Sequence, residues 1–174
     1  MGTGKTSVGR LLAEKKNRLE SRGSASGSRS QWNFIDLDEL IEFRERRRIV
    51  DIFAKEGEPY FRKVEKKALK EVAGQNKFVV ACGGGVVLDK KNIQAMKKSG
   101  IMVCLTAAPK EILKRVSANT QRPLLNVKDP ARRIEVLLKM RAPYYMQADK
   151  TIDTTGFSIK EVVEKISRIA DKKK

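Results

Sequence analysis

Two short apolar runs most constrain what this chain can fold into. The first extends from Phe78 to Cys82 and ends in three glycines, and the second extends from Ile101 to Leu105. Neither run alternates apolar with polar residues, which is typical of strands buried on both faces of a parallel sheet. A helical pattern over residues 90–99 lies between them. The pattern therefore predicts a strand, a crossover helix and a second, parallel strand.

The rest of the chain continues this alternation. Two further strands are expected, at residues 32–37 and 151–153. Helices are expected at residues 4–19, 39–47, 50–54, 61–73, 109–118, 129–140 and 158–170. Strands that alternate with helices predict a three-layer α/β/α domain with a mainly parallel sheet. A length of 174 residues fits one such domain over the whole chain.

The absence of histidine excludes several kinds of catalytic site. Serine–histidine triads, cysteine–histidine nucleophiles and histidine-bound zinc or iron all require an imidazole, and the chain has none. Lysine, arginine, aspartate and backbone amides remain for chemistry. The two cysteines, Cys82 and Cys104, both lie in apolar runs and form no disulfide framework. A reducing, cytoplasmic location is expected.

The charge of the chain predicts an anionic partner. Its 38 lysines and arginines exceed its 21 acidic residues, for a net charge of +17. Nucleic acid and phosphorylated small molecules are the two candidates, but the basic residues are spread along the chain and few aromatic side chains are available for stacking. A membrane partner is not expected, because no apolar stretch reaches the ~20 residues of a spanning helix and no apolar leader opens the chain.

The first residues match the end of a phosphate-binding loop. Gly2 to Thr6 read GTGKT, the final part of G-x-x-x-x-G-K-[ST]. In that loop, backbone N–H groups and a helix N-terminus hold phosphates, the lysine meets the β and γ oxygens, and the threonine ligates Mg²⁺. Such a short match is also compatible with an ordinary loop-to-helix junction.

Two aspartates follow the strand expected at residues 32–37. Asp36 and Asp38 stand at its carboxyl end, where ligands bind in open α/β sheets. Because alternate strand residues point the same way, both carboxylates can face the phosphate loop. The alternative is that Asp38 only caps the following helix.

A basic and acidic pair and a triple glycine supply further candidates. Arg62 and Glu65 are spaced i, i+3 on a predicted helix, where the carboxylate can orient the guanidinium, although a plain surface pair has the same spacing. Gly83–Gly85 follow a buried strand. They form either a flexible turn or a place where a ligand approaches backbone amides closely.

Two more arginines are candidates for anion binding. Arg122 lies in a polar loop that can act as a lid over transferring phosphates, and an ordinary surface loop is the alternative. Arg141 is expected at a helix end, where it can pair with the helix dipole or with an anionic ligand.

The order of these motifs resembles that of bacterial shikimate kinases. The motifs are GTGKT, FIDLDELIE, EGE-x-x-FR-x-x-E, CGGGVV, NT-x-RPLL and RAPYY. The resemblance covers nearly the whole chain outside a Ser/Gly/Arg tract, and six linked motifs are far more specific than any one of them. It implies a P-loop kinase fold and ATP-dependent phosphorylation of the 3-hydroxyl of shikimate, in the route to chorismate and the aromatic amino acids.

The resemblance also implies roles for individual residues. The catalytic set is Lys5, Asp38 and Arg122. ATP is expected to contact Gly2, Thr3, Gly4, Lys5, Thr6, Ser7, Arg115 and Arg122, and Mg²⁺ is expected at Thr6 and Asp36. Shikimate is expected to contact Asp38, Arg62, Gly83, Gly84, Gly85 and Arg141. Within the domain, residues 37–70 would bind shikimate and residues 115–130 would form the lid.

The sequence departs from the family in two places. Met1 falls where the resemblance puts an internal loop residue, so the first strand is expected to be absent and its two neighbours to have open edges. A start codon placed too late, a fragmentary gene or an inactive relative would each explain this. Residues 20–31 exceed what one helix and a short loop require and are expected to be a flexible insertion.

Three functions remain possible at this point. The first is a monomeric shikimate kinase that binds no nucleic acid. The second is another P-loop kinase acting on a small molecule. The third is a basic, inactive relative that binds nucleic acid, which steeply salt-dependent binding to DNA would reveal.

Overall fold

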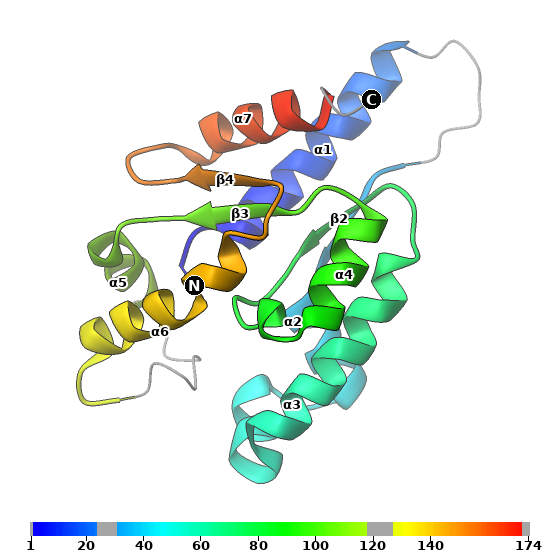
Figure 1. The fold of residues 1–174 in the computed structure, drawn as a ribbon. Coiled ribbons are helices and arrows are strands. Elements are labelled where there is room, and N and C mark those ends of the chain that lie inside the picture. The colour runs from blue at the N-terminus through cyan, green and yellow to red at the C-terminus, as the bar shows by residue number, and fades with distance from the viewer. Residues whose placement is uncertain (1, 24–30, 118–126, 172–174) are drawn as a thin grey trace.

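Helices and parallel strands alternate along the chain (Figure 1). The computed structural model describes residues 2–23, 31–117 and 127–171. The strands are β1 (Asn33–Asp36), β2 (Phe78–Ala81), β3 (Val103–Thr106) and β4 (Lys150–Asp153). The helices are α1 (Lys5–Gly23), α2 (Leu37–Glu45), α3 (Ile49–Ala73), α4 (Lys90–Ser99), α5 (Pro109–Ser117), α6 (Pro130–Tyr145) and α7 (Ile159–Asp171), with a 3-10 turn η1 (Val86–Leu88).

The strands pair in parallel, as the apolar runs predict. β1 pairs with β2, with Asn33 opposite Phe78, and β3 pairs with β4, with Val103 opposite Lys150. Among the described residues these are two separate two-stranded sheets, because β2 and β3 do not pair with each other. The expected open edges are therefore present on β2 and β3.

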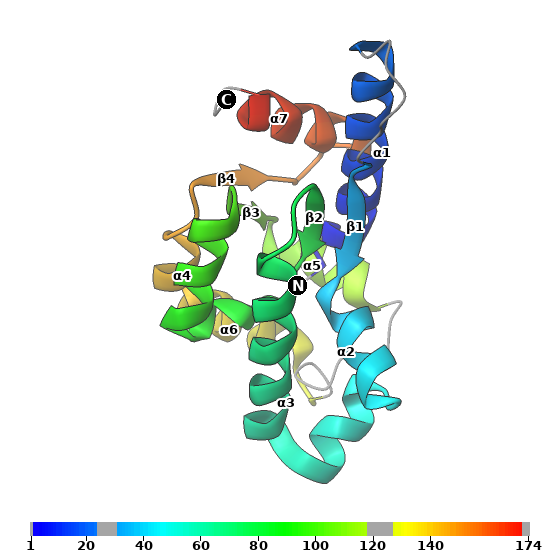
Figure 2. The same cartoon turned by 90° about the vertical axis from the view of Figure 1, so that its right-hand side faces the viewer.

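Adjacent residues of β2 face different helical layers. Val79 packs on the cluster formed by α1, β4 and α7, whereas Val80 packs on the cluster formed by α2, α3, η1 and α4. Both faces of the strand are thus covered by helices, which gives the predicted three layers. Figure 2 shows α1 and α7 on one side of the strands and α3 and α4 on the other.

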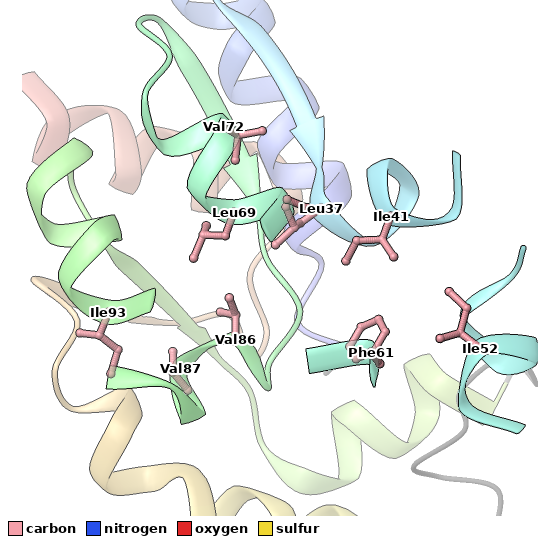
Figure 3. Close-up of a cluster of buried hydrophobic side chains, with 10 residues drawn as sticks. Leu37, Ile41, Ile52, Phe61, Leu69, Val72, Val86, Val87 and Ile93 are labelled. Carbon is pink, nitrogen blue, oxygen red and sulfur yellow. The ribbon is translucent and has the colours of Figure 1, made fainter. Parts of the chain in front are cut away.

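The largest cluster of buried side chains is formed mainly by residues of α2 and α3 (Figure 3). Leu37, Ile41 and Ile52 are almost fully buried. Phe61 and Phe53 pack against each other, with their ring centroids 4.9 Å apart. Val86 and Val87 of η1 and Ile93 of α4 complete the cluster. The triple glycine is therefore attached to a packed element at its carboxyl end.

The first helix is longer than the sequence predicts. It continues to Gly23, so residues 20–23 are helical rather than part of the insertion. Side-chain contacts explain the extension, because Glu20 accepts hydrogen bonds from Trp32 Nε1 at 2.8 Å and from Lys77 Nζ at 2.7 Å. The central part of the Ser/Gly/Arg tract, residues 24–30, lies outside the described residues.

The break expected at Gly57 is confirmed as a kink inside α3. Gly57 has non-helical backbone angles, with φ 77°, and separates the two segments expected as helices. The end of another helix differs from the prediction. Helix α6 continues past its expected end to Tyr145 and includes Pro143. Arg141 is consequently not at a helix end. Among the described residues, no helix combines the length and apolar character needed to cross a membrane.

Candidate active site

The loop at Gly2–Gly4 leads directly into the first turn of α1. Gly2 and Gly4 have φ values of 57° and 80°, which L side chains rarely adopt. The carbonyl of Gly4 accepts the first helical hydrogen bond, from Val8 N at 2.9 Å. Lys5 opens the helix, so the N–H groups of its first turn and its positive dipole end lie at this loop. This arrangement suits phosphate binding.

Thr6 and Asp36 meet although 30 residues separate them in sequence. The Thr6 hydroxyl donates to Asp36 Oδ2 at 2.6 Å. The other carboxylate oxygen of Asp36 accepts from Asp38 N at 3.0 Å and caps α2. The alternative that Asp38 caps the helix is therefore wrong: α2 begins at Leu37, and Asp38 lies in its first turn.

The same pair suits a magnesium ion held jointly with a nucleotide. Mg²⁺ in kinase sites is usually bound by one or two protein oxygens, by phosphates and by water. Thr6 and Asp36 supply two such oxygens at the helix that would face the phosphates. Among the described residues there is no group of three acidic, cysteine or histidine side chains that would form a complete protein cage.

Asp38 and Glu65 converge on Gly83. A Cβ atom at Gly83 would lie 3.0 Å from Asp38 Oδ1 and 3.3 Å from Glu65 Oε1, so the glycine leaves both carboxylates close to the backbone. Burial raises the pKa of Glu65, and the charge of Asp38 raises it further, while Arg62 and Arg141 oppose the shift. The two carboxylates are thus close enough for the charge of Asp38 to change the pKa of Glu65.

Arg62 is held by two carboxylates against the glycine turn. It donates from Nη1 to Glu65 Oε2 at 2.7 Å, and from Nη2 and Nε to Glu58 Oε1 at 2.7 and 3.1 Å. Burial lowers its pKa, but the two acids outweigh burial and the net shift is upward. A Cβ on Gly85 would lie 2.4 Å from Arg62 Nη2. Only glycine leaves room for the guanidinium there.

Arg141 approaches the same turn from α6. It is buried, with an exposed fraction of 4%. One helical turn later, the hydroxyl of Tyr145 donates to the carbonyl of Gly84 at 2.8 Å. Burial raises the pKa of Tyr145, whereas the charge and hydrogen bond of Arg141 lower it. Tyr145 therefore connects α6 to the glycine turn, and Arg141 lowers the pKa of both Tyr145 and Glu65.

Cys82 shows that the phosphate loop and the acidic groups lie close together. Burial raises the pKa of its thiol to about 12, and Glu65, Asp38 and Asp36 raise it as well, whereas the Lys5 ammonium lowers it. The charges of Glu65, Asp38, Asp36 and Lys5 thus all change the pKa of one thiol, which lies directly after β2. The thiol stays protonated at neutral pH and is no nucleophile.

The two remaining arginines have different positions. Arg115 donates from Nη1 to Gly2 O at 3.4 Å and to Thr154 Oγ1 at 3.2 Å, so it links the phosphate loop to the turn after β4. Its neighbour Thr154 had no expected role. Arg122 and residues 118–126 of the predicted lid lie outside the described residues.

Sequence reasoning missed Glu58 and Tyr145 as parts of this site. Both lie inside the motifs that carry the resemblance, EGE-x-x-FR and RAPYY. The spacing of Glu58 and Arg62, i and i+4 on a helix, was the available signal for the first. No local signal indicated Tyr145, because its partner Gly84 is 61 residues away.

Comparison with known proteins points to one family. The family model described as shikimate kinase matches residues 21–170. A shikimate kinase from Caldanaerobacter subterraneus is 42% identical over 97% of this chain and 90% of its own length. One from Thermodesulfovibrio yellowstonii is also 42% identical, over 95% of this chain and 88% of its own.

Solved structures give the same result. A shikimate kinase from Acinetobacter baumannii in complex with shikimate superposes with a TM-score of 0.88, at 35% identity, over 100% of this chain and 90% of that one. A shikimate kinase from Bacteroides thetaiotaomicron superposes with a TM-score of 0.82 at 30% identity, over 98% of this chain and 94% of that one.

Proposed function

Because the chain belongs to the shikimate kinase family, we propose that it transfers the γ-phosphoryl group of ATP to the 3-hydroxyl of shikimate. One observation carries this proposal: the groups suited to a hydroxylated carboxylate and those suited to phosphate lie around the end of β2. Asp38, Glu65 and Arg62 surround Gly83–Gly85. The charge of Lys5 lowers the pKa of the adjacent Cys82.

The phosphate side of the site is formed by the loop and first turn of α1. Gly2 to Ser7 hold the phosphates of ATP through backbone N–H groups. Lys5 balances charge on the transferring group. Thr6 and Asp36, which already share a hydrogen bond, hold Mg²⁺ with the nucleotide, and Asp36 acts through water. The bound ion neutralises charge that develops on the β and γ oxygens.

The substrate side is formed by α2, α3, α6 and the glycine turn. Arg62 and Arg141 bind the carboxylate of shikimate, since planar guanidinium groups bind carboxylates with two parallel hydrogen bonds. N–H groups of Gly83–Gly85 complete this part of the pocket. Asp38 receives a hydrogen bond from the hydroxyl that reacts. Residues 37–70 therefore act as the shikimate-binding part of the domain.

Positioning and charge neutralisation dominate the reaction. The hydroxyl oxygen forms a bond to the γ phosphorus as the bond to the ADP oxygen breaks, and the hydroxyl proton passes to Asp38. Such transfers proceed through a loose transition state with little demand for proton removal. Arg122, carried by the lid at residues 115–130, closes on the phosphates, and Arg115 lies beside the adenine.

Substrate-dependent release of ADP tests this function. In a coupled assay, the chain should release ADP with ATP, Mg²⁺ and shikimate, but neither without shikimate nor with 3-dehydroshikimate, which has no 3-hydroxyl. Lys5→Ala should abolish the signal, while Lys98→Ala, a lysine of α4 remote from the site, should not. Equal ADP release with unrelated alcohols would instead favour another P-loop kinase.

The chain is further proposed to act as a monomer in the cytoplasm and without nucleic acid. Its charge of +17 then serves its anionic substrates rather than DNA. Light scattering would give the mass of one chain, 19.6 kDa, and a duplex DNA probe would show no salt-dependent binding. A stable dimer or a steep salt slope would contradict these two expectations.

A further inference from the structure

The three carbonyl groups of the glycine turn are held in different ways. The carbonyls of Gly83 and Gly85 accept backbone hydrogen bonds of 3.2 and 3.0 Å from η1, which follows the turn directly. The carbonyl between them, that of Gly84, is held from outside the turn, by the hydroxyl of Tyr145 at 2.8 Å. The orientation of the middle peptide unit therefore depends on a side chain of α6.

This hydrogen bond also sets the direction of a backbone donor. A peptide unit is planar, and across a trans bond its C=O and N–H groups point in opposite directions. The carbonyl of Gly84 points to Tyr145, so the N–H of Gly85, which belongs to the same unit, points away from Tyr145. That N–H lies close to Arg62, because a Cβ atom on Gly85 would be 2.6 Å from Arg62 Cζ. The donor thus lies next to the guanidinium proposed to bind the substrate carboxylate.

The reverse orientation of this peptide unit is open to glycine. Reversal requires rotation about ψ of Gly84 and φ of Gly85 only, and φ of Gly85, now −94°, would become positive. Glycine adopts positive φ about as readily as negative φ. The two hydrogen bonds to η1 belong to the neighbouring peptide units and would survive. Tyr145 therefore favours one of two orientations that the rest of the turn permits.

Reversal would exchange the group that faces the substrate. The carbonyl oxygen of Gly84 would take the place of the N–H of Gly85. Backbone N–H groups attract anions, whereas a carbonyl oxygen carries a partial negative charge and repels them. Burial raises the pKa of Tyr145, so its hydroxyl stays protonated at neutral pH and can donate. The hydrogen bond that opposes reversal is thus maintained at neutral pH.

We propose that Tyr145 is a positioning residue whose hydroxyl keeps the N–H of Gly85 directed at the carboxylate of the substrate. The substrate in this statement rests on the proposed function, whereas the orientation of the peptide unit does not. Arg141 lies four residues before Tyr145, on the same face of α6. One helix therefore supplies a guanidinium for the carboxylate and also orients the backbone donor beside Arg62.

Steady-state kinetics of Tyr145→Phe test this role, because the substitution removes the hydroxyl and keeps the ring. The KM for shikimate should rise about five- to tenfold, the effect of one typical hydrogen bond. The kcat and the KM for ATP should stay within about twofold, because the group affected binds the substrate in the ground state and the transition state alike. Tyr144→Phe is the matched control, since Tyr144 is the neighbouring residue of α6 and packs against the same apolar cluster. It should change none of these values.

Two further measurements look at the peptide unit itself. A crystal structure of Tyr145→Phe without substrate should show the Gly84–Gly85 peptide reversed or in both orientations. In proton–nitrogen spectra, shikimate should move the Gly85 amide proton downfield in the unmodified chain and clearly less in the variant. A change of overall packing alone would not give this difference at one amide.

Several results would overturn the proposal. A single, unreversed peptide in Tyr145→Phe would do so, and so would an unchanged KM for shikimate. An equal rise of KM in Tyr144→Phe would also do so, since it would mean a general disturbance of α6. If the unmodified chain neither binds nor phosphorylates shikimate, the proposed function is wrong, and the crystal structure of the variant still decides whether Tyr145 orients the peptide.

Discussion

Arg62 donates a hydrogen bond of 2.7 Å to Glu65, whose side chain is only 2% exposed. Breaking a buried ion pair costs far more than breaking a surface pair, because one charge is left without compensation. The bond also fixes one side of the guanidinium fork. Glu65 is therefore a positioning residue for Arg62. Because burial disfavours its charged form, its effect on the stability of the fold depends on pH.

The raised pKa of Glu65 predicts a pH-dependent effect of Glu65→Gln on stability. A carboxyl whose pKa is higher in the folded than in the unfolded chain stabilises the fold at low pH, and this contribution is lost as pH rises through the folded pKa. Relative to Glu65→Gln, the unmodified chain should thus lose stability as pH rises above about 4.3, the ordinary glutamate value.

Urea unfolding of both proteins between about pH 4 and pH 8 measures this difference. Glu14→Gln serves as the control, because Glu14 is exposed on α1 and lies outside the site. A difference between the two proteins that stays constant with pH, or grows in the opposite direction, would contradict the raised pKa.

Gly85→Ala should weaken shikimate binding. The new methyl group would lie 2.4 Å from Arg62 Nη2, so the guanidinium has to move away from the turn. A displacement of about 1 Å at a reacting or binding group can cost a hundredfold, and we expect the KM for shikimate to rise about ten- to a hundredfold while the KM for ATP changes little.

Gly74→Ala is the matched control for this substitution. Gly74 follows the last residue of α3, the helix that carries Arg62, and its Cβ would meet no atom closer than 3.9 Å. It should leave both KM values unchanged. An unchanged KM for shikimate in Gly85→Ala would remove Arg62 from the substrate pocket.

The layered fold was predictable from local sequence patterns. Phe78–Ala81 and Val103–Thr106 are apolar at nearly every position, and this requires helices on both faces whatever the details of packing. The residues of both strands are nevertheless only partly buried, apart from Ala81, because a cavity of about 480 Å³ lies between β2 and β3 and leaves their edges open. That opening was expected only through the resemblance.

The details of the site depend on contacts that local sequence does not encode. Asp36 and Asp38 are equally good N-caps by residue type, and the choice depends on where β1 ends and on the hydrogen bond of Asp36 with Thr6. Pro143 normally marks a helix end, yet α6 continues through it. The prediction that Arg141 lies at a helix end was therefore wrong. The predicted pairing of Arg62 with Glu65, which depends only on their i, i+3 spacing in one helix, was correct.

Asp36→Asn should separate the metal-binding role of this residue from its capping role. Asparagine caps helices as well as aspartate does, so the free energy of unfolding should change by less than about 1 kcal/mol. The carboxylate charge near Thr6 is lost, and kcat should fall at least about tenfold with a higher Mg²⁺ requirement. Kinetics at varied Mg²⁺ and urea unfolding measure the two effects.

Asp89→Asn is the matched control for the capping role. Asp89 caps α4 by accepting a hydrogen bond from Lys91 N at 2.7 Å, and it lies outside the proposed site. Its kcat should not change. If Asp36→Asn kept full activity at low Mg²⁺, the proposed metal site at Thr6 and Asp36 would be wrong.

Glu58→Gln should improve the affinity for shikimate. Glu58 binds Arg62 through both Nη2 and Nε, the two nitrogens that a substrate carboxylate would use. Its own side chain is 44% exposed, so substrate can displace it at a cost typical of a surface ion pair. Removing its charge should lower the KM for shikimate about two- to fivefold, because such pairs contribute at most about 1 kcal/mol.

Glu56→Gln provides the comparison, since Glu56 is a similarly exposed acid of α3 that pairs with Arg47 at 3.1 Å instead. Steady-state kinetics should show an unchanged KM for shikimate in this variant. Because Glu65 still holds the other side of Arg62, kcat should remain the same in both variants. A higher KM for shikimate in Glu58→Gln would mean that Glu58 orients Arg62 for the substrate rather than competing with it.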